Sequence, residues 1–163
     1  MHVRSVIAPS AVALACTLLP LAASGAPEAA PLRCAGKVAT VVGSANDDTI
    51  DVSKRRRAQV IVAKGGNDLV YGTSRNDRIC GGPGDDTLYE MDGSDIIKGG
   101  TGWDEIPDGA RRVVAGKGND KIYLHSGERS TVLGGRGIDT LWYGDRDDRC
   151  RSIERWRYSR RGC

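Results

Sequence analysis

A nine-residue phrase, which reads GGPGDDTLY at 81–89, constrains this chain more than any other feature. Glycine occupies its first, second and fourth positions, aspartate its sixth and an aliphatic residue its eighth. The phrase recurs as near-full copies at 99–107 and 134–142, as copies lacking a leading glycine or two at 63–71 and 115–123, and as looser copies at 43–51, 72–80 and 90–98. Self-similarity at a fixed period predicts a stack of equivalent short turns and strands.

The eighth position of the phrase is aliphatic throughout, which a flexible glycine-rich linker has no reason to maintain. In a short strand the middle side chain points to one face and its neighbours point to the other. We therefore expect the core to be a column of Ile50, Ile61, Val70, Ile79, Leu88, Ile97, Ile106, Val113 or Val114, Ile122, Val132 and Leu141. Burial of this column does not offset the cost of ordering the turns, so the turns need a further source of stability.

These repeated glycines, aspartates and aliphatic residues resemble the RTX family of parallel β-rolls across residues 43–142. The resemblance implies an all-β parallel β-roll, or solenoid, that binds several Ca²⁺ ions and folds when they bind. It also implies that the turns hold the metal. The turn chemistry agrees, because glycine permits positive φ and lets carbonyl oxygens point into the turn, beside the sixth-position carboxylate. Ca²⁺ takes about six to eight hard oxygen ligands, which stacked turns can supply together.

The expected calcium ligands are the sixth-position aspartates and the backbone of the turn glycines. They are Asp48, Asp68, Asp77, Asp86, Asp95, Asp104, Asp120 and Asp139, together with Gly82, Gly84, Gly100, Gly102, Gly116, Gly118, Gly135 and Gly137.

The two edges of such a roll are expected to differ, because successive phrases alternate between them. On one edge the sixth positions are Asp48, Asp68, Asp86, Asp104, Asp120 and Asp139. On the other they are Gln59, Asp77, Asp95, Arg111 or Arg112, and Ser130. We expect one nearly continuous calcium edge and a second edge with one or two sites, where arginines replace metal as the cationic partner.

Residues 1–26 have the features of a secretory signal peptide. Arg4 precedes an apolar run from Val6 to Leu21, and small residues follow it. The prolines within the run argue against a membrane span. We therefore expect a secreted, extracellular protein. Residues 27–42 are expected to cap the first turn of the roll.

The cysteines that remain after the leader are even in number, which in an exported chain indicates disulfides. They are Cys34, Cys80, Cys150 and Cys163. Of the possible pairings we favour Cys34 with Cys80 and Cys150 with Cys163, while free packed thiols remain an alternative. A zinc site has little support, because His125 is the only histidine after the leader and no two cysteines are closely spaced.

Residues 143–163 form a basic tail bounded by cysteines, with seven arginines against four acidic residues. We expect this segment to cap the last turn. The alternative is a surface for anionic partners.

The sequence lacks a catalytic constellation, so we expect a calcium-binding protein that is not an enzyme. An alternative is an adhesion module, in which Tyr71, Tyr89, Tyr123, Trp142 and the basic tail contact cell-wall or matrix polysaccharide. A polysaccharide lyase or epimerase on a β-helical scaffold has the least support. We expect a monomer with no nucleic-acid partner and no membrane span.

Overall fold

The computed structural model describes residues 29–107, 110–124, 129–144 and 148–157. The predicted signal peptide, 1–26, lies outside the described residues, as does Cys163. No helix in the described part of the chain is long and apolar enough to cross a membrane.

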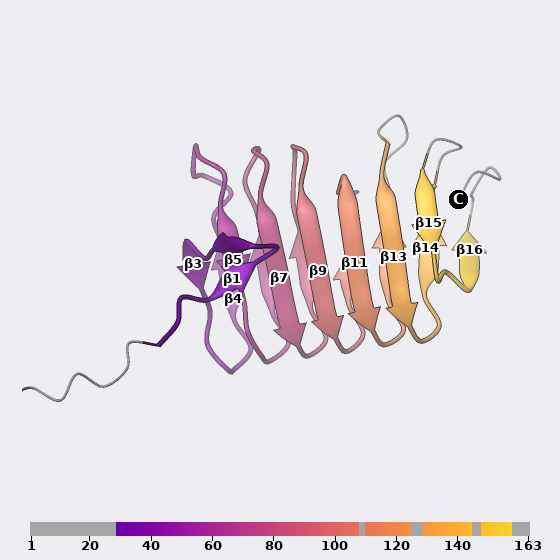
Figure 1. The fold of residues 1–163 in the computed structure, drawn as a ribbon, viewed down its shortest axis with the longest axis horizontal. Coiled ribbons are helices and arrows are strands. Elements are labelled where there is room, and N and C mark those ends of the chain that lie inside the picture. The colour runs from indigo at the N-terminus through magenta and orange to yellow at the C-terminus, as the bar shows by residue number, and fades with distance from the viewer. Residues whose placement is uncertain (1–28, 108–109, 125–128, 145–147, 158–163) are drawn as a thin grey trace, which may run out of the picture.

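Two parallel sheets of seven strands each make up the body of the molecule (Figure 1). The chain alternates between the sheets, so each sheet contains every second strand. The odd sheet consists of β3 (Val41–Val42), β5 (Val60–Val62), β7 (Arg78–Pro83), β9 (Ile96–Thr101), β11 (Arg112–Lys117), β13 (Thr131–Arg136) and β15 (Arg149–Arg151). The even sheet consists of β4 (Thr49–Asp51), β6 (Leu69–Tyr71), β8 (Thr87–Tyr89), β10 (Glu105–Ile106), β12 (Lys121–Tyr123), β14 (Thr140–Trp142) and β16 (Arg155–Arg157). The predicted all-β parallel β-roll is confirmed.

The core between the sheets is the aliphatic column expected from the eighth positions. Residues of both sheets are 0% exposed, among them Ile79 and Val113 of the odd sheet and Leu88 of the even sheet. The open choice between Val113 and Val114 is settled in favour of Val113, which pairs in register with Ile97 and Val132. Alternation along each strand thus leaves the seventh and ninth positions on the outer faces.

Pro107 stands at a strand position and shortens the even sheet locally. Strand β10 ends at Ile106, and only Glu105 pairs with Thr87 of β8. A residue without an amide donor cannot complete the hydrogen-bond ladder, which accounts for the weak pairing there.

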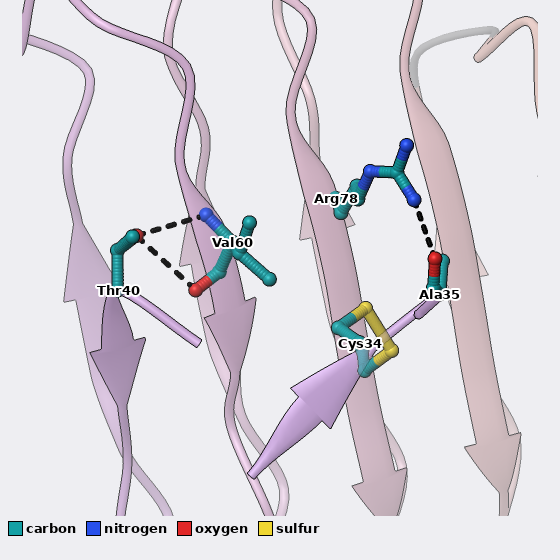
Figure 2. Close-up of a disulfide and its surroundings, with 6 residues drawn as sticks. Cys34, Ala35, Thr40, Val60 and Arg78 are labelled. Atoms are coloured by element: carbon teal, nitrogen blue, oxygen red, sulfur yellow. Dashed lines mark hydrogen bonds between the residues drawn. A yellow bond between two sulfur atoms is a disulfide. The ribbon is translucent and has the colours of Figure 1, made fainter. Parts of the chain in front are cut away.

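The N-terminal segment forms a small antiparallel hairpin of β1 (Arg33–Cys34) and β2 (Lys37–Val38) before the first parallel strand. A disulfide joins Cys34 to Cys80 of β7, as predicted (Figure 2). The guanidinium of Arg78 donates a hydrogen bond to the carbonyl of Ala35 beside it. The hairpin is thereby fastened to the outer face of the odd sheet. Of the second predicted pair, Cys150 is disulfide-bonded and Cys163 lies outside the described residues.

The roll extends beyond Trp142, where the sequence pattern was expected to stop. Strand β15 pairs with β13, and β16 pairs with β14, both in parallel. The eighth positions of these strands hold Cys150 and Trp156, which register with Val132 and Leu141. Because neither residue continues the aliphatic pattern, this last turn is not visible as a repeat in the sequence.

Candidate metal centre

The turns that lead from each odd strand to the next even strand stack along one edge of the roll, here called the aspartate edge. Their sixth positions are the predicted acidic series, Asp48, Asp68, Asp86, Asp104, Asp120 and Asp139. The series has one further member that the sequence analysis missed, since Glu154 occupies the corresponding place before β16.

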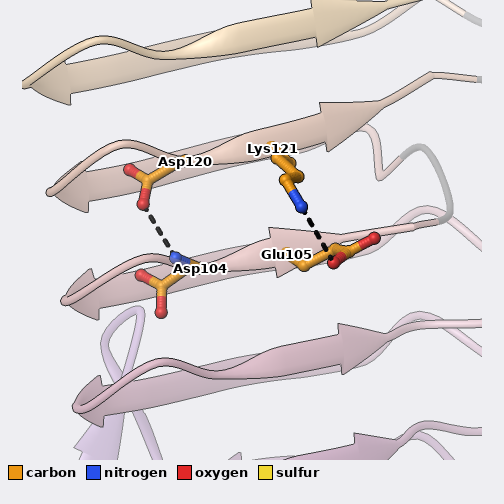
Figure 3. Close-up of polar contacts among 4 residues, drawn as sticks. All are labelled: Asp104, Glu105, Asp120 and Lys121. Carbon is orange, nitrogen blue, oxygen red and sulfur yellow. Dashed lines mark hydrogen bonds and ion pairs between the residues drawn. The ribbon is translucent and has the colours of Figure 1, made fainter.

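From Asp68 onward, each carboxylate of this edge accepts a hydrogen bond from the backbone of the preceding turn. The amide of Asp104 donates to Oδ1 of Asp120 at 2.9 Å (Figure 3). In the same way, the amide of Asp86 donates to Oδ1 of Asp104 at 3.1 Å. Equivalent bonds of 2.8–3.0 Å run from the amides of Asp48, Asp68, Asp120 and Asp139. One oxygen of each carboxylate is thus committed to holding two turns in register.

The second oxygen of these carboxylates is buried and makes no hydrogen bond within the described chain. This holds for Oδ2 of Asp68, Asp86, Asp104, Asp120 and Asp139. These side chains are at most 2% exposed. A buried carboxylate oxygen without a partner is costly, so each member of this row is a place where a cation would stabilise the fold.

Burial raises the pKa values of the aspartates on this edge. The pKa of Asp104 is raised to about 8, chiefly by removal from water and also by repulsion from neighbouring Asp120 and Asp86. For the same reason the pKa of Asp86 and that of Asp120 are each raised to about 6. The pKa values of Asp68 and Asp139 are also raised, chiefly by burial. Without a cation the protein therefore opposes ionisation of the central carboxylates.

In the turns that begin with Gly81, Gly99 and Gly134, a backbone carbonyl approaches the same space as the Oδ2 atom of the sixth-position aspartate. A Cβ placed on Gly81 would lie 2.1 Å from Oδ2 of Asp86 and 2.8 Å from the carbonyl oxygen of Gly99. At Gly99 the corresponding distances are 2.2 Å to Oδ2 of Asp104 and 2.5 Å to the carbonyl oxygen of Ala115. The first-position glycine therefore leaves open a space on which a carboxylate oxygen and a carbonyl oxygen converge.

The eight glycines predicted as backbone ligands all have φ between 126° and 143°. At Gly82 a side chain is also excluded by space, since a Cβ would lie 1.6 Å from the carbonyl oxygen of Lys64. These glycines thus allow the backbones of successive turns to approach closely.

Two of the predicted ligands already have partners in their own turn. The amide of Ser44 donates to Oδ2 of Asp48 at 2.5 Å, and the amide of Thr73 donates to Oδ2 of Asp77 at 2.5 Å. The Asp77 Oδ1 atom also accepts bonds from the Gln59 amide and the Thr73 hydroxyl. Ser or Thr at the second position is therefore the sequence signal that distinguishes these turns from those with an unpaired carboxylate oxygen.

The fifth position carries a second set of contacts that the sequence analysis missed. The amide of Asp85 donates to Oδ1 of Asn67 at 2.8 Å, and the amide of Trp103 donates to Oδ1 of Asp85 at 2.7 Å. These bonds run in the opposite direction along the stack from those of the sixth position. The recurrence of Asn or Asp at the fifth position could have indicated them.

On the opposite edge, where the chain returns from even to odd strands, the sixth positions are mixed. The amide of Asp77 donates to Asp95, and the amide of Ser130 donates to Asp148, a residue absent from our predicted series. In the turn between those of Asp95 and Ser130, Arg111 occupies the sixth position, because the next residue, Arg112, begins β11. The structure thus places the predicted acidic residues unevenly, with the continuous row on the aspartate edge.

The donor set of the aspartate edge fits Ca²⁺. All its convergent groups are hard oxygens, from carboxylates and from backbone carbonyls. No three His, Cys, Asp or Glu side chains of the described residues gather into a metal-binding cluster. Backbone carbonyls would therefore have to complete any coordination shell.

A model of a known repeat family matches the same part of the chain. Its description is the RTX calcium-binding nonapeptide repeat, and it matches four copies within residues 58–89, 91–106 and 112–128. The chain carries RTX calcium-binding nonapeptide repeats. The RTX repeats account for the turns that hold Asp68, Asp86, Asp104 and Asp120. No curated protein and no solved structure matches the chain.

Proposed function

We propose that this chain is a secreted, non-catalytic, monomeric RTX protein that binds several Ca²⁺ ions along the aspartate edge and folds when they bind. The observation that carries the proposal is the row of buried Oδ2 atoms without a protein partner, from Asp68 to Asp139. Bound cations would compensate these charges and couple folding to the external calcium concentration. The Cys34–Cys80 disulfide is consistent with an oxidising, extracellular compartment.

Isothermal titration calorimetry of metal-free protein tests the binding. Calcium is expected to bind at several sites per chain, with magnesium as a control that fails to reproduce the binding. The carboxylate row on one edge predicts that most ions bind there. Absence of binding at millimolar calcium would contradict the proposal.

A second candidate function is an adhesion module for cell-wall or matrix polysaccharide. The observation that favours it is a row of aromatic rings on the outer face of the even sheet. Tyr71 stacks on Tyr89 at 5.0 Å between ring centroids, and Tyr123 stacks on Trp142 at 5.6 Å. The guanidinium of Arg157 lies over the Trp142 ring at 5.8 Å.

Pull-down on insoluble cell-wall polysaccharide tests this second candidate. Tyr89→Ala and Trp142→Ala are expected to reduce retention of the folded protein if the aromatic row is the binding face. Removal of the basic tail arginines Arg155, Arg157, Arg160 and Arg161 tests the tail separately. Unchanged retention in all of these variants would exclude both faces.

A further inference from the structure

A groove with a volume of about 600 Å³ lies along the odd sheet beside the opposite edge. Five arginines line it, namely Arg78, Arg111, Arg112, Arg129 and Arg149. Their positions span most of the repeat region, so only the stacking of the turns brings them together.

Three of these arginines form a regular row on the outer face of the odd sheet. Arg78 and Arg112 both register with Ile96 of β9, from opposite sides. Arg112 and Arg149 likewise both register with Thr131 of β13. Since adjacent strands are about 4.8 Å apart, the row presents one guanidinium at roughly every 10 Å along the roll axis.

Asp77, the acidic residue that lines the groove, does not neutralise the positive charge of the arginines. The Asp77 carboxylate is 1% exposed and already accepts bonds from the Gln59 amide and from Thr73. Arg111, Arg112 and Arg149 are exposed, so their guanidinium groups are accessible to an external anion.

We propose that this groove binds a linear acidic polysaccharide through its carboxylate or sulfate groups. Guanidinium groups pair with such groups through two parallel hydrogen bonds, which gives orientation as well as affinity. The spacing of the row suits a polymer with widely separated charges, whereas nucleic-acid phosphates recur at about 3.4 Å per strand. No aromatic ring of the described chain lines the groove for base stacking, which is how single strands are usually bound. The proposal goes beyond calcium binding and requires only that the roll is folded.

The test uses the full chain, with its fold verified by circular dichroism in calcium-containing buffer. Fluorescence anisotropy of a labelled, size-defined sulfated oligosaccharide measures the affinity. The double variant Arg112→Ser/Arg149→Ser is expected to bind roughly tenfold more weakly or worse, because each arginine loses a charge-assisted hydrogen bond. The double variant Arg56→Ser/Arg57→Ser removes the same charge from an exposed loop outside the groove and is expected to bind normally.

Further comparisons separate the alternatives. Free sulfate, a neutral dextran and a single-stranded oligonucleotide are all expected to bind much more weakly than the acidic oligosaccharide. Equal losses in both double variants would overturn the groove assignment in favour of general charge attraction. A loss confined to Arg155→Ser/Arg157→Ser would assign binding to the tail instead. Binding of free sulfate as tight as that of the polymer, or preferred binding of the oligonucleotide, would overturn the polysaccharide assignment. Because the fold is checked separately, a failure to bind the oligosaccharide is distinguishable from a failure to bind calcium.

Discussion

Asp104 accepts a hydrogen bond from the amide of Asp86 through Oδ1, while its Oδ2 is buried without a hydrogen-bond partner among the described residues. One carboxylate thus does two different things. It holds consecutive turns together, and it presents a second oxygen at the position where a carbonyl of the next turn also points. Repetition of this arrangement along the edge is the basis of the proposed dependence of the roll on cations.

The substitution Asp104→Asn separates these two roles. The amide keeps the oxygen that accepts the Asp86 bond but loses the charge, so calcium affinity is expected to fall by roughly tenfold at that site. In metal-free buffer the same variant is expected to be more stable than the unmodified chain, because a buried carboxylate has been removed. Calorimetry measures the first effect, and the β signal in far-UV circular dichroism of the metal-free protein measures the second.

Asp92→Asn is the matched control, since Asp92 is exposed and lies on the opposite edge. It is expected to change neither quantity. If Asp104→Asn behaved like this control, the Oδ2 of Asp104 would have no role in metal binding.

The dependence of the metal-free fold on pH follows from the raised pKa values. The folded chain holds protons on Asp86, Asp104 and Asp120 at pH values where the unfolded chain, with a pKa of 3.8, has released them. Stability is therefore expected to fall as pH rises from about 4 to about 8. Calcium affinity is expected to rise over the same interval, because the ion competes with protons.

Far-UV circular dichroism of metal-free protein at pH 5 and pH 8 measures this effect. More β signal is expected at pH 5. A metal-free fold that is equally stable at both values, or more stable at pH 8, would show that the central carboxylates ionise without penalty.

Gly81→Ala tests whether the first position must remain open. The added Cβ would lie 2.1 Å from Oδ2 of Asp86, so the carboxylate would have to move. We expect weaker calcium binding and a loss of about 1–3 kcal/mol in the stability of the calcium-bound protein. Calcium titrations and thermal unfolding provide the readout.

Ala115→Gly provides the matched comparison, because alanine already occupies the first position of that turn. That change opens the space instead of filling it, and it is expected not to weaken calcium binding. Equal behaviour of the two variants would contradict a steric role for the first position.

Reduction of the Cys34–Cys80 disulfide is expected to destabilise the N-terminal end of the roll. The bridge closes a loop with a sequence separation of 46 residues, for which chain entropy gives about 4 kcal/mol. The double variant Cys34→Ser/Cys80→Ser should therefore unfold at lower urea concentration in saturating calcium. An unchanged unfolding midpoint would mean that the β1–β2 hairpin contributes little to the stability of the roll.

Much of the fold could be predicted from the sequence because the repeat ties each residue type to one structural role. An aliphatic residue at the eighth position implies the core, and alternation between edges implies the acidic row from Asp48 to Asp139. The final turn was not predicted, because Cys150 and Trp156 stand at its eighth positions in place of aliphatic residues.

The chemistry of individual turns was less predictable than the fold. The hydrogen bond that the Thr73 amide donates to the Asp77 carboxylate depends on a local turn conformation, which the sixth-position pattern does not specify. The arginine groove depends on registry between strands far apart in the sequence, such as Arg78 and Arg149, and therefore appears only once the turns are stacked.

The most direct test of the central claim is far-UV circular dichroism of residues 27–163 during a calcium titration, with magnesium as control and chelator to reverse the change. The account predicts a transition from coil to β structure that calcium drives and magnesium does not, and that chelator reverses. A spectrum already folded in chelator at neutral pH and indifferent to calcium would contradict it. In that case the disulfides and the aliphatic core would suffice to hold the roll together.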